Sequence, residues 1–360
     1  MGIKKKSGWI ILVILIVGIK IFSFFPVAVE NYYSAGFYPF ISRFLRILFG
    51  WIPFSIGDIF YGVVVIYFFY IIVSFLKKLF TRQLTKKYFF TVIRQIIFTG
   101  LFVYVLFNLL WGLNYNRKGI AYQLQLNVQP YSTTELTAAL QVIVDKLNSL
   151  DSTARQNRDF LKKKKNLFSG SVHSYEKLSG QSNIFTYSSP SVKPSVFSYL
   201  GNYLGFTGYY NPFSGEAQIN TTVPLFIQPF TVCHEIGHQL GYAKENEANI
   251  AGYLSAKSSG DPVFQYSVYF DLYIYAAREL YIRDSTLLKP FREQLNAGVR
   301  KDYRELQQFY RRYKNPLEPM IWRLYGRHLR ANEQPQGIMS YNEVIAWLVA
   351  YYKKYGKEAI

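Results

Sequence analysis

Three long apolar runs near the N-terminus constrain this chain more than any other feature of its sequence. They cover residues 9–25, 59–76 and 95–113, and within them only Lys20, near the end of the first run, is charged. A helix needs about 20 apolar residues to cross the core of a bilayer, so each run predicts a transmembrane helix. The alternative for each run is a core helix buried in protein. The composition favours a membrane protein, because only 18% of the 360 residues are charged, against about a quarter in soluble domains.

Basic residues on the two sides of these runs predict an orientation. The loop between the first and second runs holds only Arg43 and Arg46, whereas other flanking segments are rich in lysine and arginine: Lys4, Lys5, Lys6, Lys77, Lys78, Arg82, Lys86, Lys87 and Arg94. The positive-inside rule places the N-terminus and the loop 77–94 in the cytoplasm. Everything after Leu113 is then extracytoplasmic, anchored in the cell (inner) membrane. A cleaved signal peptide over 1–28 is the rival interpretation, and it leaves that placement unchanged.

Two further features belong to the predicted membrane domain, residues 1–113. The segment 26–54 carries aromatic residues around Arg43 and Arg46, which indicates an amphipathic helix in the outer interface or a helix packed on the spans. Trp111 and Tyr115, at the end of the third run, are expected to anchor it at the membrane surface.

Residues 114–360 have the texture of a globular domain. Ser132 to Glu135 has capping-box spacing and precedes a helical pattern of leucines. Glycine and proline interrupt short aromatic runs over 184–222, which predicts a small sheet with a hairpin at 208–220. Residues 261–355 are typical of four or five helices. The predicted class is α+β: three N-terminal transmembrane helices followed by a mostly helical domain with a small sheet.

Charge and cysteine content narrow the functional classes. The net charge is +19, and residues 1–113 contribute 12 basic residues against 2 acids. The predicted membrane topology explains this basic excess, because basic residues flank the spans on the cytoplasmic side. Nucleic-acid binding is therefore a weak interpretation, and the expected partners are the lipid bilayer and a peptide or protein substrate. A single cysteine, Cys233, excludes an intramolecular disulfide framework and a zinc ribbon. The oligomeric state does not follow from the sequence.

The motif that indicates chemistry is His234-Glu235-Ile236-Gly237-His238. On a helix, positions i and i+4 share one face, so both imidazoles can reach one metal ion. Glu235 can hold a water molecule without binding the metal and act as general base. Zinc is the expected metal. The alternative is a pair of core histidines with Glu235 paired to a lysine.

A catalytic zinc needs a third protein ligand, and the segment Glu245-Asn246-Glu247-Ala248-Asn249 offers two candidates. Its E-x-x-A-N pattern resembles the E-x-x-(A/S)-D helix of thermolysin-like gluzincins, which implies Glu245 as ligand and Asn249 as an acceptor that orients a ligand histidine. Asn249 departs from the aspartate of that pattern. Glu247 is the alternative ligand. Gly241 is the expected helix break that lets the chain return to the metal.

Several segments together form a wider pattern: Trp111–Tyr115, Lys193–Ser198, Gly208–Ala217, His234–Gly241, Glu245–Asn249 and Gly337–Tyr341. They resemble a bacterial membrane family catalogued as domain-of-unknown-function family 3810. The resemblance implies a membrane-anchored, zincin-like hydrolase. In zincins a strand before the HExxH helix pairs with the peptide substrate, and 216–222 occupies that place. The candidates for an oxyanion stabiliser are Tyr209, Tyr210, Tyr242 and Tyr341.

The sequence therefore predicts a membrane-anchored zinc metallopeptidase that acts on the outer face of the membrane. His234, His238 and Glu245 would hold zinc, and Glu235 would be the catalytic base. The rival hypothesis is a non-catalytic membrane scaffold that retains the zincin-like fold.

Overall fold

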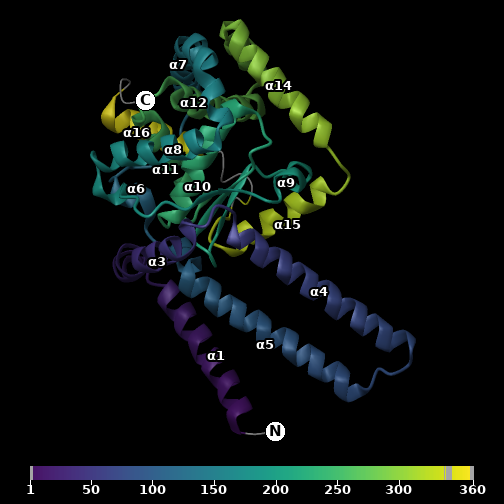
Figure 1. Ribbon diagram of the computed structural model, residues 1–360. Helices are drawn as coiled ribbons and strands as arrows, with labels where there is room; N and C mark the ends of the chain where they lie inside the picture. The colour runs from purple at the N-terminus through teal and green to yellow at the C-terminus, as the bar shows by residue number, and fades with distance from the viewer. Residues whose placement is uncertain (1–2, 336, 338–342, 357–360) are drawn as a thin grey trace.

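The computed structural model describes residues 3–335, 337 and 343–356. Helices near the N-terminus extend away from a larger globular part (Figure 1). The helices that extend are α1 Ile3–Ser23, α4 Ile56–Phe80 and α5 Lys86–Leu110. Between α1 and α4 the chain forms α2 Pro26–Ala28, the π-helical η1 Val29–Phe37 and α3 Tyr38–Gly50.

The globular part is mostly helical and contains one three-stranded sheet within the described residues. Its α-helices are α6 Gly119–Gln123, α7 Thr133–Asn157, α8 Lys164–Ser179, α9 Ser198–Leu204, α10 Gln228–Gln239, α11 Glu245–Ser258, α12 Pro262–Arg283, α13 Leu288–Gln294, α14 Ala297–Tyr313, α15 Glu318–Ala331 and α16 Glu343–Tyr355. Its strands are β1 Val192–Pro194, β2 Gly208–Asn211 and β3 Glu216–Ile219. Short 3-10 turns are η2 Gly112–Asn116, η3 Arg158–Lys162, η4 Asn183–Phe185, η5 Leu225–Ile227 and η6 Ser285–Leu287. The mostly helical fold with a small sheet agrees with the sequence.

Among the described residues, α4 and α5 are each long and apolar enough to cross a membrane. The first expected span, 9–25, does not qualify as a single straight helix. Ser7–Ser23 and Pro26–Gly50 are apolar enough only as a pair, and the chain bends by 98° between them. Pro26 lacks an N–H and disfavours helix in the residue before it, so α1 ends here. The structure thus offers two spans, or up to three if the bent pair counts as one.

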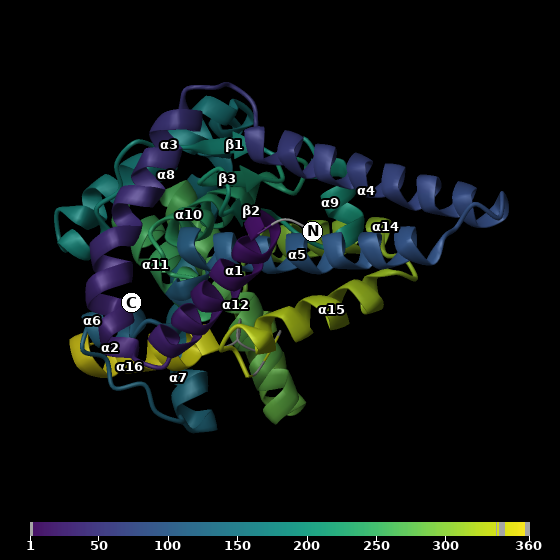
Figure 2. The ribbon, with the colours of Figure 1, turned by 90° about the horizontal axis from the view of Figure 1, so that it is seen from below.

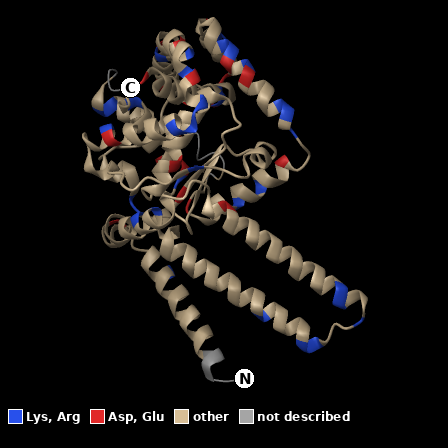
Figure 3. Ribbon diagram, in the orientation of Figure 1, with Lys and Arg blue, Asp and Glu red and all other residues tan. Residues whose placement is uncertain are grey.

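The expected loop 77–94 is much shorter than the sequence indicated. Lys77 and Lys78 lie in the last turn of α4, and α5 already begins at Lys86, so residues 81–85 alone connect the two helices. Lysine is a good helix former whose long side chain reaches the headgroups, so basic residues need not end a helix. Figure 3 shows these lysines and arginines at the end of α4 and α5 that is far from the globular part.

The ends of the apolar helices nearest the globular part are tied to it by buried polar groups. Glu216 of β3 accepts hydrogen bonds from the backbone N–H groups of Ile56 (3.2 Å) and Gly57 (2.6 Å) at the start of α4. A carboxylate is favourable at the positive N-terminal end of a helix. In α3, the Arg46 guanidinium donates to the backbone oxygen of Gln239 (3.2 Å), while Phe40 on the same helix is exposed. The segment 26–54 thus packs on the globular part.

Trp111 and Tyr115 are not membrane anchors, which corrects the expectation for them. The two side chains are buried, and Trp111 Nε1 donates a hydrogen bond to the backbone oxygen of His238 (3.2 Å). Helix α5 ends at Leu110, so the following turn already belongs to the globular core. Trp111 packs on His238 of the HExxH helix, and Tyr115 packs on Trp111, so both rings bury their area inside the protein.

The sheet has the strand order β1-β3-β2, with β1 parallel and β2 antiparallel to β3. The predicted hairpin at 208–220 is present as β2 and β3. The prediction that 216–222 binds a peptide by strand addition is wrong for β3. This strand is central, so neighbours on both sides already take its backbone hydrogen bonds.

The helices of the globular part agree closely with the sequence. Ser132 and Glu135 form the predicted capping box at the start of α7. The described residues of 261–355 form α12 to α16, within the predicted count of four or five helices. Helices α7 and α12 pack along each other, and the buried pair of α10 and α11 packs on α12 (Figure 1).

Candidate metal centre

Helix α10 carries the HExxH motif in the interior of the globular part. His234, Glu235 and His238 are each at most 9% exposed. The helix ends at Gln239, and Gly241 follows with a φ of +86°. A left-handed residue at this position favours glycine and turns the chain back towards the helix. The expected helix break at Gly241 is therefore present.

The returning chain begins α11 at Glu245, beside the two histidines. Glu245 Oε2 lies 3.3 Å from His234 Nε2 and 3.7 Å from His238 Nε2. One ligand atom from each of the three side chains falls within 4.8 Å of the others. The structure thus brings together the three residues expected to bind metal.

Small residues allow α10 and α11 to come this close. A Cβ added at Gly252 of α11 would lie 3.0 Å from the backbone nitrogen of His234. A Cβ at Gly237 of α10 would lie 3.3 Å from Ala248 O and from Ala251 Cβ. Close helix contact needs side chains without bulk at the crossing point. The glycines therefore set the distance between the histidines and Glu245.

The outer nitrogen of each imidazole faces an acceptor. His234 Nδ1 lies 2.8 Å from Asn249 Oδ1, and His238 Nδ1 lies 2.8 Å from the backbone oxygen of Tyr242. These acceptors favour the tautomer with a proton on Nδ1, which leaves the Nε2 lone pair for a metal ion. Asn249 thus has the orienting position expected for it.

Glu245 and the two imidazoles shift one another's pKa values. Burial alone would raise the pKa of Glu245, but hydrogen bonds from the two imidazoles hold it well below its usual range. Burial would lower the pKa of His238, but its contact with Glu245 raises the pKa to about 9. The cluster therefore holds a proton tightly, and a metal ion would compete for the same place.

Glu235 differs from Glu245 in its surroundings. Burial raises the pKa of Glu235, and its Oε2 has no hydrogen-bond partner in the described part of the chain. Its carboxylate packs on β2, where a Cβ at Gly208 would lie 2.8 Å from Glu235 Oε1. A buried carboxylate with a raised pKa is suited to accept a proton near neutral pH.

Glu247, the alternative ligand, lies elsewhere. Its carboxylate packs against Gly119 of α6, at a place where only glycine leaves room. Burial raises its pKa, with Arg117 among the charges that oppose the rise. Glu245 and Glu247 are two residues apart on one helix, so they point to different faces.

The structure adds partners of Glu245 that no sequence signal indicated. Tyr325 of α15 donates its hydroxyl proton to Glu245 Oε1 (2.7 Å), and Gln334 Oε1 accepts from the backbone N–H of Glu245 (3.0 Å). With 32 tyrosines in the chain, the sequence gives no reason to select Tyr325. Its hydrogen bond occupies one carboxylate oxygen and leaves the other facing the imidazoles.

Helix α12 brings a further acidic residue to the cluster. Ser267 Oγ accepts from the backbone N–H of Phe230 (3.0 Å), and Tyr275 hydrogen-bonds to Asn249. Asp271 lies four residues after Ser267 and four before Tyr275, so all three side chains share one face of α12. The charge of Asp271 interacts with His234. Asp271 is half-buried, and burial raises its pKa to about 7.

The tyrosines predicted to stabilise an oxyanion make hydrogen bonds outside the cluster. The hydroxyl of Tyr209 donates to Asp58, that of Tyr210 pairs with Tyr38, and that of Tyr242 donates to Gln123 Oε1. Tyr341 lies outside the described residues.

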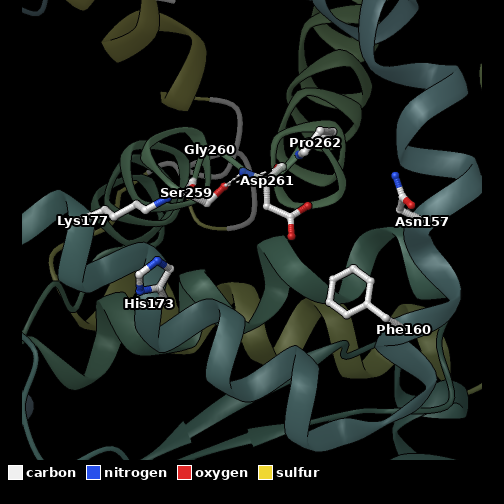
Figure 4. A pocket seen from close by; sticks show the side chains of 8 residues that line it. All are labelled: Asn157, Phe160, His173, Lys177, Ser259, Gly260, Asp261 and Pro262. Carbon is white, nitrogen blue, oxygen red and sulfur yellow. Dashed lines mark hydrogen bonds between the residues drawn. The ribbon is translucent and has the colours of Figure 1, made fainter.

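A surface pocket elsewhere on the molecule is separate from this cluster. It is lined by residues of α7, α8 and the connection from α11 to α12, among them His173, Lys177 and Asp261 (Figure 4). Lys177 Nζ donates to the backbone oxygen of Ser259 (2.6 Å), and Asp261 caps α12. Lys177 and Asp261 thus hold helix ends, and His173 pairs with the exposed Glu176 on its own helix (3.1 Å).

Fold and site together define a mostly helical protein with membrane-spanning candidates and a buried cluster of two histidines and a glutamate on two crossing helices. The chain belongs to the family described as "Protein of unknown function (DUF3810)", whose model matches residues 33–349. Searches of curated proteins and of solved structures found no match to this chain.

Proposed function

We propose that this protein is a membrane-anchored, zinc-dependent hydrolase that cleaves peptide bonds on the outer face of the membrane. The observation that carries the proposal is the approach of His234 Nε2 and His238 Nε2 to Glu245 Oε2, at 3.3 and 3.7 Å, next to a buried Glu235. Two imidazoles and one carboxylate are the ligand set of many catalytic zinc sites, which keep a further position open.

The surroundings of the three ligands fit a zinc ion. Glu235 Oε2 is buried without a hydrogen-bond partner in the described part of the chain, and leaving such an atom unpaired costs about 1–3 kcal/mol. Glu245 Oε2 is buried and faces the two imidazole nitrogens, at 3.3 and 3.7 Å. A dication at the centre of the cluster would satisfy Glu245 and attract a polar substrate group to Glu235. Bound there, zinc would supply Lewis-acid chemistry to a peptide carbonyl and to a water molecule.

Glu235 would move the proton in this reaction. It takes a proton from the attacking water as the new C–O bond forms, and gives it to the amine nitrogen as the C–N bond breaks. The raised pKa of Glu235 favours holding that proton between the two steps. Asn249 and Tyr325 act as positioning residues, because each contacts a ligand side chain.

The proposed outward orientation is supported by the basic α4–α5 connection, which lies far from the globular part (Figure 3). The positive-inside rule puts that connection in the cytoplasm and the HExxH helix on the other side. A reporter that is active only outside the cytoplasm should work when fused after Tyr355 and fail when inserted at Thr85. The reverse pattern would place the cluster in the cytoplasm.

The deciding experiment compares Glu235→Gln, Glu245→Gln and Glu247→Gln with wild type, in protein purified in detergent after zinc-supplemented expression. Wild type and Glu235→Gln should each hold about one zinc per chain, since Glu235 is not one of the three clustered ligands and would contact the attacking water instead. Glu245→Gln should lose zinc, and Glu247→Gln is the matched control that should retain it. Cleavage of a degenerate peptide library should be abolished by Glu235→Gln.

The outcomes separate this proposal from its rival. Trace zinc in the wild type would contradict the metal site. Wild-type cleavage rates in Glu235→Gln would contradict the role of general base. Full zinc without cleavage of any peptide by the wild type would favour the scaffold hypothesis. Loss of zinc from Glu247→Gln alone would transfer the third ligand to Glu247.

A further inference from the structure

Two helices of the globular part, α9 and α15, expose an apolar surface that the fold leaves uncovered. We call it the α9–α15 face, and its side chains are between 49% and 65% exposed: Val196, Tyr199, Leu200, Leu317, Met320 and Leu324. Exposed large apolar side chains gathered on one surface mark a site of interaction with a protein or a membrane.

The two helices form one continuous surface. A Cβ added at Gly205, which caps α9, would lie 3.1 Å from the Trp322 ring of α15. Asn315, just before α15, donates its amide to the backbone oxygen of Tyr203 (2.7 Å). The rings of Tyr199 and Tyr203 also pack on Tyr313, with centroids 6.1 and 5.1 Å apart.

This surface begins at the outer end of a membrane-spanning candidate. The backbone N–H of Val196 donates to Asp58 in the first turn of α4 (2.6 Å). One residue on, the Phe197 ring lies 3.8 Å from where a Cβ at Gly62 would be, inside the uncharged run that starts at Ile59. Figures 1 and 2 show α9 and α15 on the side of the globular part from which α4 extends.

The chemistry of the face suits a bilayer surface. Leu317, Met320 and Leu324 recur at helical spacing, and the exposed Arg323 and Arg327 flank them. Apolar residues beside arginine on a helix are typical of a segment that lies in the interface, with the guanidinium groups near lipid phosphates. Tyrosine is enriched in the headgroup region of membranes, and the exposed Tyr199 lies on this face.

We propose that the α9–α15 face rests on the headgroup region of the bilayer that α4 crosses. The occupant of the face is therefore lipid, in continuity with the apolar surface of α4. This contact removes apolar side-chain area from water, which stabilises it.

This contact also brings the metal centre close to the membrane, and this part of the inference rests on the proposed function. Helix α15 carries the exposed Leu324 and, at the next position, Tyr325, whose hydroxyl donates to Glu245. The same helix thus contacts lipid on one face and a ligand of the metal centre on another. The site would lie close to the bilayer and take its substrates from the membrane surface.

The test measures the depth of single labelled positions in liposomes. Leu324→Cys and Leu317→Cys are each labelled with a small environment-sensitive fluorophore, because Cys233 is fully buried and should not react in the folded protein. Ile66→Cys, 69% exposed on α4, is the membrane control. Lys301→Cys, exposed near the start of α14, is the aqueous control. That end of α14 lies far from α4 (Figure 1).

Brominated phosphatidylcholine should quench labels at positions 324, 317 and 66, and iodide in the buffer should quench the label at 301 several-fold more than these. The proposal is overturned if labels 324 and 317 behave like 301. It is also overturned if label 66 is not quenched by the brominated lipid, since α4 would then not cross the bilayer. Fluorescence does not depend on hydrolysis, so failure here leaves the role of Glu235 untouched, and the reverse holds as well.

Discussion

Replacing Gly252 with alanine tests whether the crossing of α10 and α11 sets the geometry of the metal centre. The added Cβ would lie 3.0 Å from the backbone nitrogen of His234, 3.1 Å from its Cα and 3.2 Å from a ring carbon of Phe230. Comfortable carbon contacts are about 3.5–4.0 Å, so the helices must separate by roughly 0.5 Å. That shift moves His234 away from Glu245, on the other helix.

The magnitudes predict a larger effect on zinc than on folding. Overpacking costs about 1–3 kcal/mol, and replacing glycine with alanine inside a helix returns about 1 kcal/mol, so the free energy of unfolding should fall by about 0–2 kcal/mol. Metal ligands tolerate displacements of only about 0.2 Å. Zinc must draw the helices together against the same strain of about 1–3 kcal/mol, so its affinity should fall about 5- to 140-fold at about 1.4 kcal/mol per factor of ten.

Competition with a chelating dye measures zinc affinity in detergent-purified protein, and thermal unfolding measures stability. The matched control is Gly180→Ala at the end of α8, where the added Cβ makes an ordinary 3.4 Å contact outside the crossing. This control should leave zinc affinity unchanged. Zinc affinity within twofold of wild type in Gly252→Ala would refute the argument that this crossing sets the ligand distances.

Three further predictions follow from other contacts. Asn249→Ala removes the acceptor of His234 Nδ1, so zinc affinity should fall about 10- to 100-fold in the same dye competition. Glu216→Gln removes the charge at the start of α4 and should lower the free energy of unfolding by about 1–2 kcal/mol, read from melts of detergent-solubilised protein. Burial raises the pKa of Asp271 from 3.8 to about 7, so the folded state binds its proton more tightly and stability falls as the pH rises from about 4 to 7. Asp271→Asn should remove that fall in chelator-treated protein, and equal pH dependence in both proteins would contradict it.

Local patterns in the sequence determined much of this protein. The sequence alone predicts three kinds of local structure: the apolar helices α4 and α5, the capping box at Ser132 and the hairpin at 208–220. Each depends on residues that are close neighbours in the sequence. The spacing of His234 and His238 likewise puts both imidazoles on one helix face. Gly241 predicted where that helix ends, because a left-handed residue favours glycine.

Tertiary structure decided which residues surround that motif. Spacing alone could not choose between Glu245 and Glu247, and only the crossing of α11 over α10 puts Glu245 beside the imidazoles. Tyr325 reaches Glu245 from 80 positions away. Trp111 looked like a membrane anchor and is buried against His238. The pairing of β3 on both sides ruled out its expected role in peptide binding. Contacts between distant segments depend on how whole helices and strands pack, and no local periodicity in the sequence encodes that packing.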